Sequence, residues 1–305
     1  ACAALLLATA TVSGQTTLRQ EGGRVVLENA SLRAVIDPAR GARLESLTLK
    51  TAADRIEVVT GPSVIEGVVP PGDKTAWLAE TDFRETGAEK NRVRFETALP
   101  KVESPGKPGN DVELLYYPDP DYSTVRMEKS YFLPDRAAAL AVEYRLTNTG
   151  RAAVTLCLAM QQQFGDTKGR RGEYWFPGLR GTQSHPDRRA RGDVTSLADG
   201  WIAVMSERGA GAVRWIAPNQ LTGFRLSHDG TRRTEAFSIQ ATIPPGGSWD
   251  FGTAVIPFSG MKRLSATTPL GLAGLTVDPP PAPPTPPPAT APAAATGAAT
   301  PTTTL

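Results

Sequence analysis

Apolar and polar residues alternate along most of the chain between residues 24 and 258, which is the period of a β-strand with one buried face. The alternation is clear in the runs RVVLE, ARLESLTLK, RVRFETAL, AALAVEYRLTN and SWDFGTAVIPF. Turn-forming residues separate these runs at hairpin-like intervals, as at 148–150 and 244–247. No stretch keeps a helical period of 3.6 residues with capping residues at its ends. The pattern predicts an all-β protein built as a large antiparallel β-sandwich.

Two long segments interrupt this rhythm. Residues 100–120 are rich in Pro and Gly, and residues 166–193 (DTKGRRGEYWFPGLRGTQSHPDRRARGD) show no strand pattern. Loops of this length are uncommon in a compact domain, and those that occur often bind ligands. We therefore expect segment 166–193 to be a binding loop.

The two ends of the chain differ in composition from the rest. Residues 1–14 (ACAALLLATATVSG) are apolar but shorter than the roughly 20 residues of a membrane span, and they are typical of a signal peptide remnant. A buried N-terminal strand is the alternative. Residues 278–305 hold ten of the 27 prolines, with Ala and Thr, and predict a disordered tail, solvated or in contact with the cell envelope. A single domain over residues 15–277 and export to the periplasm or the medium follow from this division.

Composition excludes several classes of function. A net charge of +2 with 21% charged residues does not fit a nucleic-acid-binding protein, and no apolar stretch is long enough for a membrane span. The chain has only two histidines and no metal-ligand spacing. We therefore expect no metal site, no cofactor, no nucleic-acid partner and no membrane span.

Three segments, in this order, resemble the galactose mutarotase-like β-supersandwich superfamily. They are ENASLRAVIDPARGARLESLTLK, MEKSYFLPDRAAALAVEYRLTNTGRAAVTLCLAMQQQFG and FSIQATIPPGGSWDFGTAVIPF, and Ala42 stands where a second Gly is common. The resemblance implies a supersandwich fold with a carbohydrate on the concave face of a sheet. Its members include aldose 1-epimerases, other sugar epimerases, and domains of hydrolases and lyases, so fold alone does not give the function.

Epimerase chemistry requires a general acid and a general base. The resemblance places the acid, a His in epimerases, at Gln161, and the base at Glu235. A side-chain amide donates a hydrogen bond but does not release a proton near neutral pH. The sequence therefore predicts a divergent member without efficient epimerase activity. Glu235, Glu173 and His185 are the catalytic candidates, and an exposed polar side chain is the alternative for Glu235 and for His185.

The residues most suggestive of binding are aromatic and amidic. Gln161 and Gln163 lie two apart on a predicted strand and should share one face. Flat aromatic rings cover the apolar face of a pyranose, while amides and charged groups bond its hydroxyls. The predicted loop and a second segment supply such groups: Arg171, Glu173, Tyr174, Trp175 and Trp77. For Trp175, a packing role that anchors its loop is the alternative.

These observations predict a secreted or periplasmic carbohydrate-binding protein. The saccharide would sit over Gln161 and Gln163 beneath segment 166–193, whose many arginines would favour an acidic sugar. An enzyme acting on an oligo- or polysaccharide (an epimerase, lyase or hydrolase) is the alternative.

Overall fold

The computed structural model describes residues 14–69, 76–78, 81–99, 122–164, 172–186, 192–206, 209–228, 232–261, 264–267 and 275–277. Residues 1–13 of the predicted signal segment, the whole 100–120 connection and the C-terminal tail lie outside these residues. Within them, no helix is long and apolar enough to cross a membrane. Two short 3-10 turns, η1 (Tyr122–Thr124) and η2 (Pro218–Gln220), are the helical elements of the described chain.

The first large sheet has eleven strands and is antiparallel throughout. Its main path runs β1 (Thr17–Glu21), β2 (Arg24–Glu28), β3 (Leu32–Asp37), β4 (Arg43–Lys50), β5 (Arg55–Val69), β11 (Val154–Phe164), β18 (Arg232–Ser238), β17 (Leu221–His228) and β14 (Gly192–Val194). Two short strands join it at the side, with β19 (Ala241–Ile243) on β11 and β6 (Ala76–Trp77) on β5. The strands of the candidate site, β11, β18 and β17, are adjacent in this sheet.

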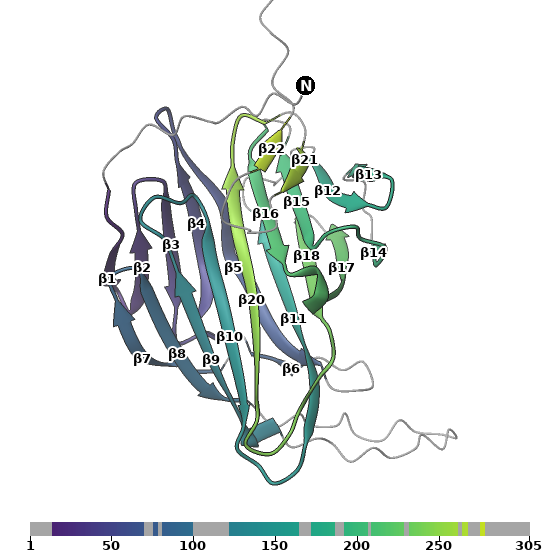
Figure 1. Ribbon diagram of the computed structural model, residues 1–305. Helices are drawn as coiled ribbons and strands as arrows, with labels where there is room; N and C mark the ends of the chain where they lie inside the picture. The colour runs from purple at the N-terminus through teal and green to yellow at the C-terminus, as the bar shows by residue number, and fades with distance from the viewer. Residues whose placement is uncertain are drawn as a thin grey trace, which may run out of the picture.

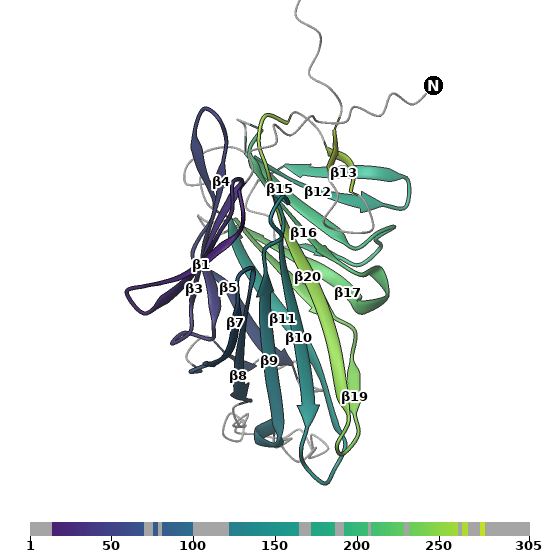
Figure 2. The same cartoon turned by 60° about the vertical axis from the view of Figure 1, so that its left-hand side comes forward.

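The second large sheet has nine strands and is also antiparallel. Its order is β13 (Gly181–Pro186), β12 (Gly172–Gly178), β15 (Trp201–Ser206), β16 (Gly211–Ile216), β20 (Ser248–Phe258), β10 (Leu140–Asn148), β9 (Val125–Phe132), β8 (Arg92–Ala98) and β7 (Arg84–Glu89). A separate hairpin joins β21 (Leu264–Thr267) to β22 (Leu275–Val277). Figures 1 and 2 show the two large sheets lying face to face.

The main core lies between the sheets. Along β10, alternate residues from Leu140 to Leu146 are buried in this core, while Glu143 and Arg145 point to the other face and are exposed. The same alternation occurs on β8 and β11. The structure confirms the predicted all-β sandwich, because the two-residue period seen in the sequence is the period of burial.

A smaller apolar cluster covers part of the outer face of the nine-stranded sheet. On β15, Ile202 and Val204 face the main core, whereas Trp201, Ala203 and Met205 belong to this second cluster. All six residues of β15 are therefore buried. The continuous apolar run WIAVMS results from burial on both faces.

The buried Asn29 fixes the turn in the first of the resemblance motifs. Asn29 accepts hydrogen bonds from the backbone N–H of Ser31 and Leu32, at 2.8 and 2.7 Å, and donates to the carbonyl of Pro134 at 2.7 Å. Asn29 lies before β3 of one sheet and Pro134 follows β9 of the other. The first Asn of the motif therefore joins the two sheets.

The turn before β4 explains the glycine pattern of the same motif. Gly41 and Ala42 both have positive φ, at 72° and 42°, and Ala42 is the one non-glycine residue with positive φ in the described chain. Glycine adopts this conformation without the steric cost that a side chain brings. The carbonyl of Ala42 accepts a 2.7 Å hydrogen bond from the buried Tyr131 hydroxyl, which holds the turn against the opposite sheet.

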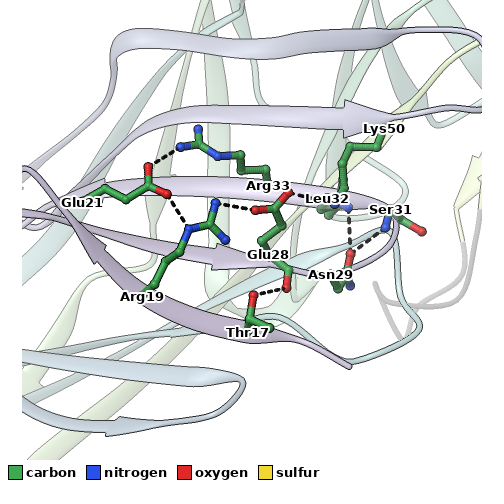
Figure 3. A network of polar contacts seen from close by, with 9 residues as sticks. All are labelled: Thr17, Arg19, Glu21, Glu28, Asn29, Ser31, Leu32, Arg33 and Lys50. Carbon is green, nitrogen blue, oxygen red and sulfur yellow. Dashed lines mark hydrogen bonds and ion pairs between the residues drawn. The ribbon is translucent and has the colours of Figure 1, made fainter. Parts of the chain in front are cut away.

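Ion pairs link the first four strands on their outer face (Figure 3). Glu28 contacts Arg19 of β1 at 2.6 Å and Lys50 of β4 at 3.0 Å, while Arg33 of β3 contacts Glu21 of β1 at 2.8 Å. These contacts connect the edge strand β1 to the interior of the sheet.

The prediction that residues 166–193 form one long loop is wrong. Residues 172–178 form β12, residues 181–186 form β13, and residues 192–194 form β14. Their alternation was obscured by Gly, Pro and Arg in the sequence, but β12 is secured by pairing on both sides, with β13 and β15.

Candidate functional site

Three polar side chains line up across adjacent strands on the outer face of the eleven-stranded sheet. Gln161 of β11 pairs with Glu235 of β18, and Glu235 pairs with Arg225 of β17. The Gln161 Nε2 donates a 3.0 Å hydrogen bond to Glu235 Oε1, and an Arg225 guanidinium nitrogen lies 3.6 Å from Glu235 Oε2. We call this set the Gln161–Glu235–Arg225 row.

Alternation along the strands places this row on the side away from the main core. Met160 of β11, Ala236 of β18 and Phe224 of β17 are all core residues, so their neighbours in sequence face outward. The side chain of Glu235 is 17% exposed, because amide and guanidinium groups flank it. Its carboxylate is held on both oxygens, which fixes its orientation in the sheet surface.

Arg225 contributes a second kind of contact. Its guanidinium carbon lies 5.2 Å from the centre of the Phe237 ring, within the range of a cation–π interaction. The planar guanidinium therefore joins an aromatic ring and a carboxylate in one surface. Such a surface offers hydrogen-bond donors and acceptors beside an apolar ring, which are the groups that bond sugar hydroxyls and cover sugar C–H faces.

The three consecutive glutamines do not share an environment. Gln161 and Gln163 are half-buried, and Gln163 pairs with Arg233 on the same outer face. Gln162 points into the sandwich and is 0% exposed. The predicted common face of Gln161 and Gln163 is confirmed.

The backbone places Trp77 near this row. Trp77 of β6 pairs with Gly67 of β5, and Gly67 pairs with Ala159, two residues before Gln161 on β11. The side chain of Trp77 and the whole of Arg171 lie outside the described residues, so their predicted roles stay predictions.

The aromatic pair predicted in segment 166–193 does not lie near the Gln161–Glu235–Arg225 row. Tyr174 and Trp175 belong to β12 in the nine-stranded sheet, where Tyr174 is 0% exposed in the main core and Trp175 is 8% exposed in the second cluster. Neither ring presents a free face on which a sugar could stack. The packing alternative considered for Trp175 fits this arrangement.

The remaining catalytic candidates lie on the same hairpin as this pair. Glu173 is half-buried on β12, and His185 is exposed on β13, opposite Tyr174. Both belong to the nine-stranded sheet, whereas Glu235 belongs to the other sheet. The structure therefore brings Gln161 and Glu235 together but not Glu173 or His185 with them.

Sequence reasoning missed Arg225. The alternation in TGFRLSH indicates that Arg225 faces the other side of the strand from Phe224 and Leu226. Only the strand order reveals that β17 lies beside β18 and therefore that Arg225 lies beside Glu235. Among the described residues, no group of three His, Cys, Asp or Glu side chains could hold a metal ion.

Two surface depressions lie away from this row. One, of about 420 Å³, is on the outer face of the nine-stranded sheet, and the other, of about 500 Å³, lies over β2, β3 and β4. Neither depression includes a residue of the row.

Comparison with known proteins places the fold. No protein family model matches the chain, and no curated protein matches it in sequence. Solved structures do match: a galactose mutarotase-like protein from Clostridium acetobutylicum (TM-score 0.54, 11% identity, 80% of this chain and 99% of that chain) and a putative aldose 1-epimerase from Escherichia coli K12 (TM-score 0.54, 11% identity, 80% and 99%). A TPR-domain containing protein from Parabacteroides distasonis also matches (TM-score 0.55, 12% identity), over 77% of this chain but only 46% of that chain, so the chain spans about half its length.

This protein has the galactose mutarotase-like fold. The resemblance inferred from the sequence motifs is confirmed at the level of architecture. At identities near 11% the likeness shows the fold alone, so the site must be argued from its own residues. Within that fold, the two positions matched separately to the epimerase acid and base, Gln161 and Glu235, are hydrogen-bonded neighbours.

Proposed function

We propose that this protein binds a saccharide on the outer face of the eleven-stranded sheet, over the Gln161–Glu235–Arg225 row, without efficient epimerase activity. The observation that carries the proposal is the 3.0 Å hydrogen bond from Gln161 to Glu235, which places an amide beside the carboxylate. An amide–carboxylate–guanidinium row binds hydroxyl groups well but lacks a group that delivers a proton near neutral pH.

The absence of a proton donor at position 161 makes the epimerase claim testable. General acid–base assistance contributes on the order of 10²–10⁴-fold to such a reaction. We therefore expect polarimetry of freshly dissolved α-glucose and α-galactose to show mutarotation close to the uncatalysed rate. A rate comparable with that of a working aldose 1-epimerase, lost in Glu235→Gln, would contradict the proposal.

The binding claim is tested first by a screen. A glycan array that carries neutral and uronate oligosaccharides should identify a ligand class for the purified protein. Arg225 and Arg233 lie on this face with one carboxylate, Glu235, and the excess of positive charge supports a preference for uronates. If the folded protein binds no saccharide on the array or in concentrated solution, the proposal fails.

An enzyme acting on an oligosaccharide is the second candidate. Glu235 is the one carboxylate on β11, β17 and β18, and it is held by its neighbours. Glycoside hydrolysis usually uses two carboxyl groups about 5–10 Å apart, so a lone carboxylate on these strands favours binding over hydrolysis. Release of reducing ends from the array ligand, abolished in Glu235→Gln, would support the enzyme instead.

Export to the periplasm or the medium is also part of the proposal. It is supported by the apolar run at residues 3–12 of the sequence. Fractionation of cells that express the gene should recover the protein outside the cytosol, and recovery of uncleaved cytosolic protein would contradict export.

A further inference from the structure

We propose a second saccharide site, independent of the first, in the depression on the outer face of the nine-stranded sheet, and we infer that it takes a neutral sugar. The depression has a volume of about 420 Å³ and lies over β8, β9, β10 and β20. That volume is in the range of pockets that hold small ligands.

The pairing register explains why the sheet is hollowed at this point. Ser130 of β9 and Gly252 of β20 lie on either side of Glu143 of β10, in one row across the outer face. The next row, two residues along each strand, carries Glu128, Arg145 and Asp250. Small side chains in one row beside long charged ones in the next leave a hollow in the surface.

Ser130 is the strongest pointer to a ligand. The residue is 4% exposed, and it lines the depression, so its hydroxyl is the polar group on the floor of the hollow. A ligand hydroxyl in the hollow would hydrogen-bond to the Ser130 hydroxyl, which both donates and accepts.

The charges around the hollow determine the kind of ligand. Three arginines and three carboxylates line it: Arg92, Arg94, Arg145, Glu128, Glu143 and Asp250. Arg92 pairs with Glu143, and Arg145 pairs with Asp250 through two contacts of 2.8 and 3.2 Å. The balanced signs give no net attraction to an ion, while the paired groups still offer donors and acceptors to hydroxyls.

The hollow can be filled by one substitution without strain. A Cβ added at Gly252 would meet no atom within 4 Å, and the backbone there is compatible with any L-residue. Val is well suited to a strand, so Gly252→Val should fold and should block the floor of the depression. Ser248→Val is the matched control, because it adds a branched side chain to the same face of β20 outside the depression.

The test is a titration of ¹⁵N-labelled protein with maltose and lactose, followed through backbone amide shifts. We expect saturable shifts at Ser130, Glu143 and Gly252 with a Kd on the order of 1 mM. Gly252→Val should remove these shifts, Ser130→Ala should weaken binding by about three- to tenfold, and Ser248→Val should leave binding unchanged.

Three results would overturn the inference. The first is the absence of saturable shifts at these amides with either sugar. The second is binding that Gly252→Val does not affect. The third is a response to D-glucuronate or glucosamine but not to maltose or lactose. Shifts at Gln161 and Glu235 report on the first site separately, so either site can fail without the other.

Discussion

Gln162 sits between two residues of the proposed binding face but points in the opposite direction. Its side chain is fully buried, and neither its amide oxygen nor its amide nitrogen has a hydrogen-bond partner among the described residues. Thr234 pairs with Gln162 from β18, and its buried hydroxyl also has no hydrogen-bond partner among the described residues. The strands that present the Gln161–Glu235–Arg225 row therefore carry uncompensated polar groups on their core side.

Replacing this buried amide should stabilise the protein. Gln162→Met keeps a similar length and removes two unsatisfied polar atoms, each of which costs about 1–3 kcal/mol when buried. We expect the free energy of unfolding in urea to rise by about 1 kcal/mol or more. Gln163→Met, on the half-buried outer face, should change it little. A destabilised Gln162→Met would mean that internal water bonds the amide.

At the level of elements, Asn148 holds the end of β10 against the start of β11. It accepts a 2.9 Å hydrogen bond from the N–H of Gly150 and donates to the carbonyls of Ala152 and Ile243, at 2.7 and 2.9 Å. Asn148 is fully buried. It thereby fixes the turn through which β11 enters the other sheet.

Loss of Asn148 should therefore be costly. Asn148→Ala breaks three hydrogen bonds and leaves two carbonyls without this partner, so we expect a loss of about 2–4 kcal/mol in the free energy of unfolding. Thr149→Ala, which removes one exposed side-chain bond to the carbonyl of Thr124, should cost under about 1 kcal/mol. Equal effects of the two substitutions in urea unfolding would contradict this role of Asn148.

The ion pairs of β1 to β4 predict a dependence of stability on pH. Burial alone would raise the pKa of Glu28, but hydrogen bonds from Lys50 and Arg19 outweigh it and lower the pKa of Glu28 below its usual 4.5. A lowered carboxyl pKa contributes stability that is present above the unfolded pKa and lost as pH falls through the folded one.

We expect Lys50→Met to raise the pKa of Glu28, measured by NMR, towards 4.5. In the parent protein, the Glu28 pair should make the free energy of unfolding larger at about pH 6 than at about pH 3. Lys50→Met should reduce this difference by at most about 1 kcal/mol, which is the size found for surface ion pairs. High salt should reduce the difference in the parent protein. An unchanged pKa of Glu28 in Lys50→Met would show that the Lys50–Glu28 ion pair does not lower this pKa in solution.

At the scale of the whole molecule, the sequence predicts the architecture better than the site. The two-residue period reveals the sandwich because it follows burial directly, and the motif asparagines mark turns that need a buried amide. The burial of Trp175 and the place of Arg225 beside Glu235 could not be predicted, for one reason. Which strands neighbour each other depends on the strand order, and a local pattern of residues does not contain it.

The same limit applies to the second depression. Ser130, Glu143 and Gly252 are distant in sequence, and each has an ordinary strand pattern around it. Only the register of β9, β10 and β20 brings two small residues to the sides of a carboxylate. No sequence signal could have identified this hollow without the pairing of the strands.

The central claim is that the Gln161–Glu235–Arg225 row binds a saccharide, and calorimetric titration of the best glycan-array ligand tests it most directly. We predict that Gln161→Ala weakens binding by about tenfold, since one side-chain contact and the orientation of Glu235 are lost. Gln20→Ala, an amide on β1 that bonds Glu85 instead, should bind as the parent does. Equal affinities for the parent, Gln161→Ala and Gln20→Ala, with all three proteins folded, would contradict the account.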